Sequence, residues 1–177
     1  MRRPLDIPPP INPFFMDNSV LDQMAILISG FRSQEKDDRA TCMQKIVQYG
    51  SEAVPLLTHQ LLDQDWKVRY RAAESLGMIK SDDAVPALIM ICSDKKDHVR
   101  YMAAKALGLI KSPDAVPVLI QLLSDEHLYT RGISSEALAA IRDHRGKKAL
   151  EMALVREEDP TVQERISQSL ILMNKKE

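Results

Sequence analysis

Aromatic side chains, excess charge and long apolar runs are all scarce in this chain of 177 residues. Aromatic residues make up 5% of the sequence, with three Phe and one Trp, whereas Ala, Leu, Ile and Met are abundant. Because sheets favour β-branched and aromatic residues, this composition favours closely packed helices. No apolar run approaches the roughly 18 residues of a membrane span, and none follows the N-terminal Met-Arg-Arg-Pro. We therefore expect a soluble, cytoplasmic protein.

Charge and cysteine content narrow the function classes further. The 24 Lys and Arg residues nearly balance the 25 Asp and Glu residues. Binding to nucleic acid or to an anionic membrane requires a surplus of basic side chains on one face, so this balance argues against both. Cys42 and Cys92 lie far apart within helix-like patterns. A disulfide between them is one alternative, but the pattern favours two buried, reduced thiols.

An internal repeat organises the chain. Residues 66–96 and 97–127 are identical at 18 of 31 positions without a gap. A period of this length indicates a solenoid. The first unit has one apolar face of helical period, formed by Val68, Ala72, Ala73, Leu76 and Ile79. The small residues on this face, together with Gly77, allow a neighbouring helix to approach closely. Each unit is thus predicted to be a helical hairpin.

The rest of the chain divides around these two units. Residues 1–18 contain five prolines, which exclude a helix and favour an extended arm. This arm either covers the apolar edge of the first helices or binds a partner as a linear motif. The remaining chain, 19–177, is predicted to be one domain, with a cap helix at 19–32, repeats at about 36–65, 66–96, 97–127 and 128–159, and a half repeat at 160–177.

Three motifs in the repeat resemble a known family. They are V-R-x-x-A-A-x-x-L-G-x-I at 68–79, A-V-P-x-L at 84–88 and Ser-Asp at 93–94, and all recur 31 residues later. These motifs resemble the HEAT family, in particular its short repeats of the phycobilin lyase type. The resemblance implies an all-α, right-handed superhelix, an α-solenoid of about four and a half helical hairpins.

A charged pattern accompanies the motifs. The spacing Pro-x7-Asp-x5-Arg occurs three times and places acid and base at Asp63, Arg69, Asp94, Arg100, Asp125 and Arg131. The resemblance implies that these residues form a structural ladder of hydrogen bonds along the turns between repeats. Lys148, Glu157 and Gln163 depart from the pattern, so we expect the last repeat to be less regular.

No pattern in the sequence supports catalysis. The four histidines, His59, His98, His127 and His144, show no metal-ligand spacing and are expected on the surface. Some HEAT relatives are di-iron hydroxylases with repeated His-Glu pairs, and this chain has no His-Glu dipeptide. Glycine-rich phosphate loops and Ser-His-Asp sets are also missing. The charged ladder recurs in every unit, whereas a catalytic pair is needed once. We therefore expect no cofactor, no metal and no enzymatic activity.

Three surfaces remain as candidate protein-binding sites. In a solenoid the second helices are expected to line the concave side, and their outward residues include His59, Ile89, Met90, Ile120 and Gln121. The edge between repeats carries Trp66, Tyr70, Tyr101 and Tyr129, residue types that suit interface hot spots. At the C-terminal end, Ile171, Leu172 and Met173 have no following helix, which suggests a homodimer contact or a site for a larger partner.

The sequence therefore predicts a non-catalytic scaffold or adaptor that binds a partner protein through its concave face. One alternative, from the resemblance, is an accessory subunit of a lyase or of a maturation system. Nucleic-acid binding is a third alternative, since Lys80 and Lys111 repeat. It is disfavoured because the repeated arginines are expected in the ladder.

Overall fold

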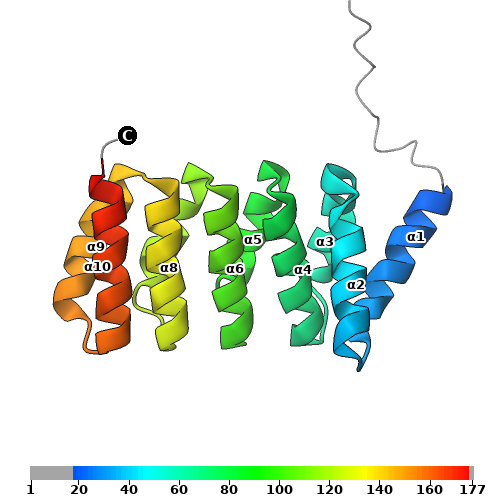
Figure 1. The fold of residues 1–177 in the computed structure, drawn as a ribbon, viewed down its shortest axis with the longest axis horizontal. Coiled ribbons are helices and arrows are strands. Elements are labelled where there is room, and N and C mark those ends of the chain that lie inside the picture. The colour runs from blue at the N-terminus through cyan, green and yellow to red at the C-terminus, as the bar shows by residue number, and fades with distance from the viewer. Residues whose placement is uncertain (1–17, 176–177) are drawn as a thin grey trace, which may run out of the picture.

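The computed structural model describes residues 18–175, and this part of the chain consists of ten α-helices without strands (Figure 1). Residues 1–17 of the expected arm lie outside the described residues, and Asn18 is the first residue of α1. The helices are α1 (Asn18–Ser29), α2 (Lys36–Val47), α3 (Val54–Gln60), α4 (Trp66–Ile79), α5 (Val85–Ile91), α6 (Asp97–Ile110), α7 (Val116–Leu122), α8 (Leu128–Ile141), α9 (His144–Arg156) and α10 (Pro160–Asn174).

Polar caps and turn residues determine where the helices begin. Asp65, Asp143 and Asp159 are the N-cap residues of α4, α9 and α10, and each side chain accepts a hydrogen bond from a backbone N–H of the first turn. Such bonds satisfy donors that have no partner within the helix. Pro86 and Pro117 are the second residues of α5 and α7, where a missing N–H costs little.

Helices α4, α6 and α8 end in the same way, with a residue in the left-handed conformation that is not glycine. Lys80, Lys111 and Arg142 have φ angles of 59°, 66° and 62°. Each donates its backbone N–H to the carbonyl four residues earlier, which closes the last turn of α4, α6 and α8. After Lys80 and Lys111 the chain makes a short 3₁₀ turn and enters the next helix.

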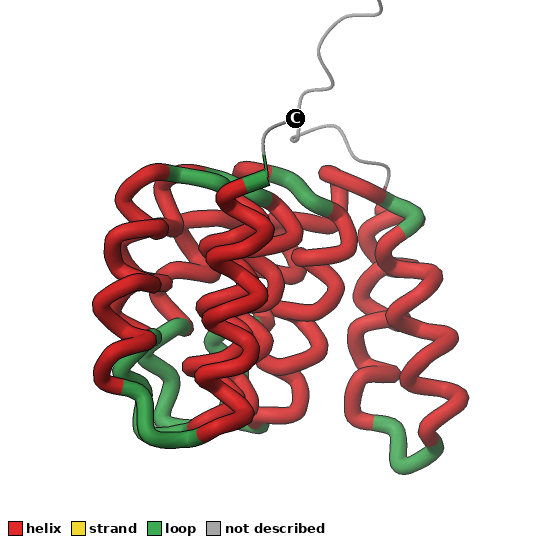
Figure 2. The backbone as a smooth tube through the Cα atoms, turned by 60° about the vertical axis from the view of Figure 1, so that its left-hand side comes forward, coloured by secondary structure: helices red, strands yellow, loops and turns green. Residues whose placement is uncertain are grey.

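The helices form two rows, as Figures 1 and 2 show. We call α2, α4, α6, α8 and α10 the first helices, and α3, α5, α7 and α9 the second helices. Each first helix from α4 to α8 stacks directly on the next one, and each second helix packs mainly on the first helix that follows it. One continuous apolar core runs between the rows, from Met24 to Ile166. The predicted all-α solenoid is confirmed.

Glycine and alanine set the spacing of the first helices. A Cβ atom added to Gly77 would lie 2.8 Å from the Cα of Ala106, and one added to Gly108 would lie 2.8 Å from the Cα of Ala137. The backbones of α4, α6 and α8 are therefore nearly in contact at these points. The second helices have no comparable contact with one another.

This stacking corrects the expected orientation of the array. In a curved two-row array, the row with the closer spacing lies on the inside of the curve. The first helices are the closely spaced row. They, rather than the second helices, therefore line the concave side.

Replacing Gly108 by Ala should lower the free energy of unfolding by about 1–3 kcal/mol, because the new methyl group would overlap α8. Urea unfolding measures this change. Gly146→Ala in α9 is the matched control, since its Cβ would meet side-chain atoms of Leu138, the nearest at 3.2 Å, and no backbone atom of a neighbouring helix. This control should be neutral or stabilising, because alanine favours a helix by about 1 kcal/mol over glycine. Equal losses in both variants would contradict the proposed role of close stacking.

Replacing Lys111 by Gly should raise the free energy of unfolding by about 1 kcal/mol, because glycine adopts the left-handed conformation without steric cost. The same change at Lys105, inside α6, should lower it by about 1 kcal/mol. Thermal unfolding of the two variants therefore gives shifts of opposite sign. A loss of stability in Lys111→Gly would mean that the side chain of Lys111, and not its backbone conformation, determines its contribution to stability.

Candidate protein-interaction surface

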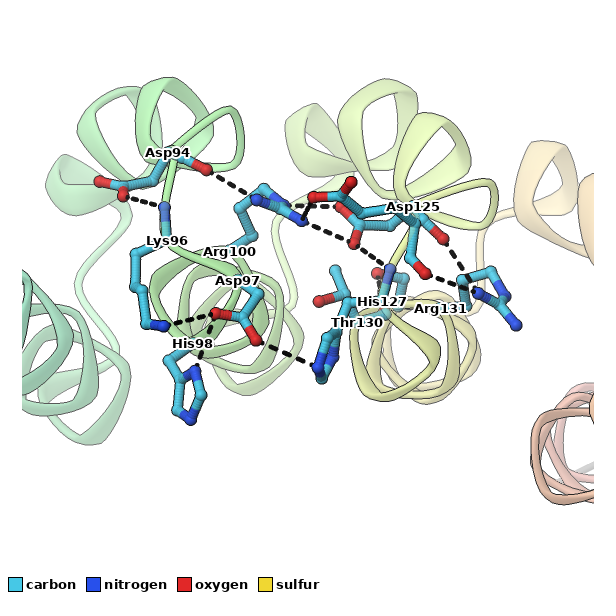
Figure 3. Close-up of polar contacts among 11 residues, drawn as sticks. Asp94, Lys96, Asp97, His98, Arg100, Asp125, His127, Thr130 and Arg131 are labelled. Carbon is cyan, nitrogen blue, oxygen red and sulfur yellow. Dashed lines mark hydrogen bonds and ion pairs between the residues drawn. The ribbon is translucent and has the colours of Figure 1, made fainter.

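An arginine in each repeat joins two successive turns. The Nε and Nη2 atoms of Arg69 donate to the carboxylate of Asp94 at 2.6 and 2.7 Å, and its Nη1 donates to the carbonyl of Asp63 at 2.8 Å. Arg100 makes the equivalent bonds to Asp125 and to the carbonyl of Asp94 (Figure 3). Bidentate arginine–carboxylate pairs of this kind are strong and fix geometry. The ladder is therefore an interaction between repeats, not within one turn.

The ladder carboxylates also hold the turn that precedes each first helix. Asp94 accepts a bond from the backbone N–H of Lys96 at 2.8 Å, and Asp125 accepts one from His127 at 2.9 Å. Burial opposes the ionisation of Asp94, but the bonds from Arg69 and Lys96 outweigh it and lower its pKa. The same residues thus fix both the spacing of the repeats and the position of the side chains at the start of α6 and α8.

The ladder continues through the residues that depart from the motif. Arg131 donates from Nε and Nη2 to Glu157, both at 2.7 Å, and the side-chain amide of Gln163 donates to the carbonyl of Glu157. At the other end, Arg32 forms the ion pair with Asp63. The longer glutamate and the neutral glutamine therefore keep the geometry of the last turn.

Rings from three repeats form a row beside the ladder. Trp66, His98, His127 and Tyr129, which we call the aromatic row, have successive ring centroids 5.2, 6.5 and 5.5 Å apart. These separations are typical of tilted aromatic pairs. All four residues lie at the start of a first helix or next to it. The row therefore crosses the array at the N-terminal ends of α4, α6 and α8.

Asp97 connects two members of the aromatic row (Figure 3). Its two carboxylate oxygens lie 2.9 Å from the Nδ1 of His98 and 3.1 Å from the Nε2 of His127. Lys96 approaches the same carboxylate at 3.3 Å and lies 5.3 Å from the centroid of Trp66. The bond from His98, helped by Lys96, lowers the pKa of Asp97. A carboxylate on α6 thus links a histidine of its own helix to the N-cap residue of α8.

Two shallow hollows adjoin the aromatic row on the first helices. One, of about 210 Å³, is lined by Tyr70, Tyr101 and Tyr129 and by Asp97. At its edge the Nδ1 of His127 is buried and has no hydrogen-bond partner in the part of the chain that the structure describes. The other, of about 560 Å³, lies between α2 and α4 and extends from Trp66 towards Met78. We call it the α2–α4 groove.

The residues predicted on the second helices lie on the opposite side of the molecule. Ile89, Met90 and Gln121 line a hollow of about 380 Å³ between α5 and α7. Met90 is 68% exposed, but Ile89 and Ile120 are half-buried and pack against the core, which corrects their expected exposure. The exposed residue His59 does not reach that hollow.

At the C-terminal end, Ile171 and Leu172 are 58% and 51% exposed, whereas Met173 is half-buried against the core. The expected homodimer contact there stays a prediction.

Cys42 and Cys92 are free thiols, and burial raises the pKa of Cys92 to about 12.

The sequence missed three members of the candidate surface. His98 and His127 were expected to be ordinary surface histidines, and Asp97 was assigned no role. A signal was present, because the two most similar repeats differ at these positions: Trp66 corresponds to Asp97, and Lys67 to His98. Lys67 and His98 are exposed, so packing in the core does not explain this difference between the repeats.

The described range contains neither a metal site nor a membrane span. Residues 18–175 hold no group of three or more His, Cys, Asp or Glu side chains that could bind a metal. Within the same residues, no helix is long and apolar enough to cross a membrane.

Comparisons with known proteins agree with this architecture. Residues 24–100 and 92–171 match the family described as HEAT repeats. The chain therefore belongs to the HEAT-repeat family. A comparison with curated protein sequences finds no match.

Several solved structures share the fold. The complex of CpcE and CpcF of phycocyanin lyase from Nostoc sp. PCC7120 matches with a TM-score of 0.77 and 22% identity, over 84% of this chain and 98% of that chain. A designed armadillo repeat protein in complex with a (KR)4 peptide matches with a TM-score of 0.58 and 17% identity, over 89% and 85%. Human deoxyhypusine hydroxylase in complex with glycerol matches with a TM-score of 0.54 and 18% identity, over 90% and 66%.

The ladder predicts a specific dependence of stability on pH. Replacing Asp94 by Asn should lower the free energy of unfolding by about 1.5–3 kcal/mol at neutral pH, because Arg69 loses a charged acceptor. The pKa of Asp94 is lower in the folded chain than in the unfolded chain. Its contribution is therefore complete above the ordinary carboxyl pKa of about 4 and is lost as the pH falls through the folded value.

Urea unfolding of wild type and Asp94→Asn should accordingly differ less at about pH 3 than at neutral pH. The control is Asp82→Asn, since Asp82 is exposed and lies outside the ladder; it should stay within about 0.5 kcal/mol of wild type. A difference between wild type and Asp94→Asn that does not change with pH would contradict an ionic contribution.

Proposed function

We propose that this protein is a non-catalytic scaffold that binds a partner protein across the concave face of its first helices. The aromatic row is the observation that carries the proposal. Its rings come from three repeats and are held in place by the ladder and by Asp97, yet Tyr129 remains 57% exposed. Tyrosine and tryptophan are the residue types most often found at the energetic centre of protein interfaces.

Rigidity supports the same proposal. The turns that carry the aromatic row are fixed by bidentate ion pairs whose side chains are largely buried: those of Arg69 and Asp94 are 7% and 8% exposed. A surface that is already ordered loses little conformational entropy on binding. The proposed site therefore consists of Trp66, Tyr70, Tyr101 and Tyr129, as the sequence predicted, together with His98 and His127.

A second candidate function is an accessory subunit of an enzyme. It is favoured by the similarity to the CpcE and CpcF complex of phycocyanin lyase, which extends over 98% of the matched chain. This candidate uses the same concave face but predicts that the partner is an enzyme subunit or a protein that carries a cofactor. The identity of a captured partner distinguishes the two.

The proposed surface is tested with paired variants. Replacing His98 and Tyr129 together by Ala should weaken the binding of a partner, identified by affinity capture and cross-linking, at least about tenfold. Both side chains are exposed, so circular dichroism should show an intact fold. Met90→Asp changes an equally exposed residue on the second helices and should leave binding unchanged. Loss of the partner in Met90→Asp alone would assign the site to the second helices instead.

A further inference from the structure

The α2–α4 groove combines an apolar floor with positively charged walls. Ala40 and Met43 of α2 face Tyr70 and Met78 of α4 across its floor. Met78 is 46% exposed. The exposed methionine and the neighbouring tyrosine are suited to adaptable apolar contacts.

Four cationic side chains line this groove. They are Lys36, Arg39, Lys67 and Arg71, and they face a single lining carboxylate, Glu74. The chain as a whole has a formal charge of −1, so this excess is local. A concave site with one sign of charge attracts ligands of the opposite sign.

The two arginines differ from those of the ladder. Nη1 of Arg71 donates to the carbonyl of Phe31 at 2.7 Å, and Nη1 of Arg39 donates to the carbonyls of Ser33 and Gln34 at 2.9 and 2.7 Å. Neither forms an ion pair with a carboxylate anywhere in residues 18–175. A guanidinium carries five N–H donors, so both arginines keep donors for a ligand.

The surroundings of Arg71 disfavour its positive charge. Burial lowers the pKa of Arg71, and the nearby charge of Arg39 lowers it further, while Asp65 and Glu74 oppose these effects at longer range. Glu74 is itself half-buried: burial raises its pKa, although Lys105 and Arg71 act against this. Two cations that repel each other in a partly desolvated groove are stabilised when an anion binds between them.

We propose that the α2–α4 groove binds an acidic, amphipathic segment of the partner protein, with carboxylates on Arg39 and Arg71 and apolar side chains on the methionine-containing floor. This inference rests on the proposed scaffold function and adds the chemistry of the partner. A peptide fits better than a nucleic acid, because the floor is apolar and the cations do not continue along the face. Beyond α4 that face carries Asp97 and Glu136 as well as Lys105.

The test is a selection of phage-displayed random peptides on the full-length protein. Selected peptides should be enriched in Asp and Glu next to Leu, Phe or Met, and their affinity should fall as salt is raised. The variant Lys36→Glu with Lys67→Glu should weaken their binding at least about tenfold. Both lysines are exposed, so the fold should persist. Lys45→Glu with Lys148→Glu makes the same charge change at exposed sites outside the groove and should have no such effect.

Other outcomes overturn the inference in distinguishable ways. Peptides without acidic enrichment, or peptides lost only in the His98 and Tyr129 variant, would place the site on the aromatic row and leave the scaffold function standing. If labelled oligo-dT binds as tightly as the selected peptides, the ligand of the groove is a nucleic acid and not a peptide. If peptides are selected only on the double variant Phe14→Ser with Phe15→Ser, the ligand of the groove is the N-terminal segment of this chain. If no peptide binds any of these proteins, the groove inference fails, while the captured partner and its dependence on His98 and Tyr129 still decide the scaffold proposal.

Discussion

The close approach of successive first helices is the constraint on which the rest of the structure depends. It exists because Gly77 and Gly108 present no side chain to Ala106 and Ala137. Larger residues would separate α4, α6 and α8, and the arginine of one turn would no longer reach the carboxylate of the next. The spacing also places the ring of His98 5.2 Å from that of Trp66 and 6.5 Å from that of His127, at the starts of neighbouring first helices. Packing inside the array thus determines the geometry of its surface.

The ladder makes the geometry of the proposed binding surface depend on the same spacing of the repeats. Each central carboxylate binds the arginine of its own repeat and a backbone N–H two residues further along the chain, as Asp125 does with Arg100 and His127. Removing the carboxylate would therefore loosen the spacing of the repeats and the start of a first helix together. A recurring ion pair of this kind stabilises the array and also orders the side chains that a partner would meet.

Much of the fold could be predicted from the sequence, because the apolar period of 3.6, the small residues and the caps are local properties. Which row of helices lines the concave side could not be predicted. The period shows which face of a helix is buried, but curvature depends on which row packs more closely, and that depends on contacts between repeats. For the same reason Ile89 was expected to be exposed, although neighbouring side chains bury half of it.

The proposed binding surface was only partly predictable, since its members come from different repeats. Trp66 and the tyrosines could be found by residue type, whereas His98 and His127 gain their significance from Asp97, which joins them between the starts of α6 and α8. The positions at which the two most similar repeats differ on the first helices include Lys67/His98, Glu74/Lys105 and Met78/Leu109, and these are exposed or half-buried. Identical positions such as Leu76 and Leu107 are buried. Differences between equivalent exposed positions therefore point to part of the proposed surface, whereas Tyr70 and Tyr101, which are identical in the two repeats, are found by residue type alone.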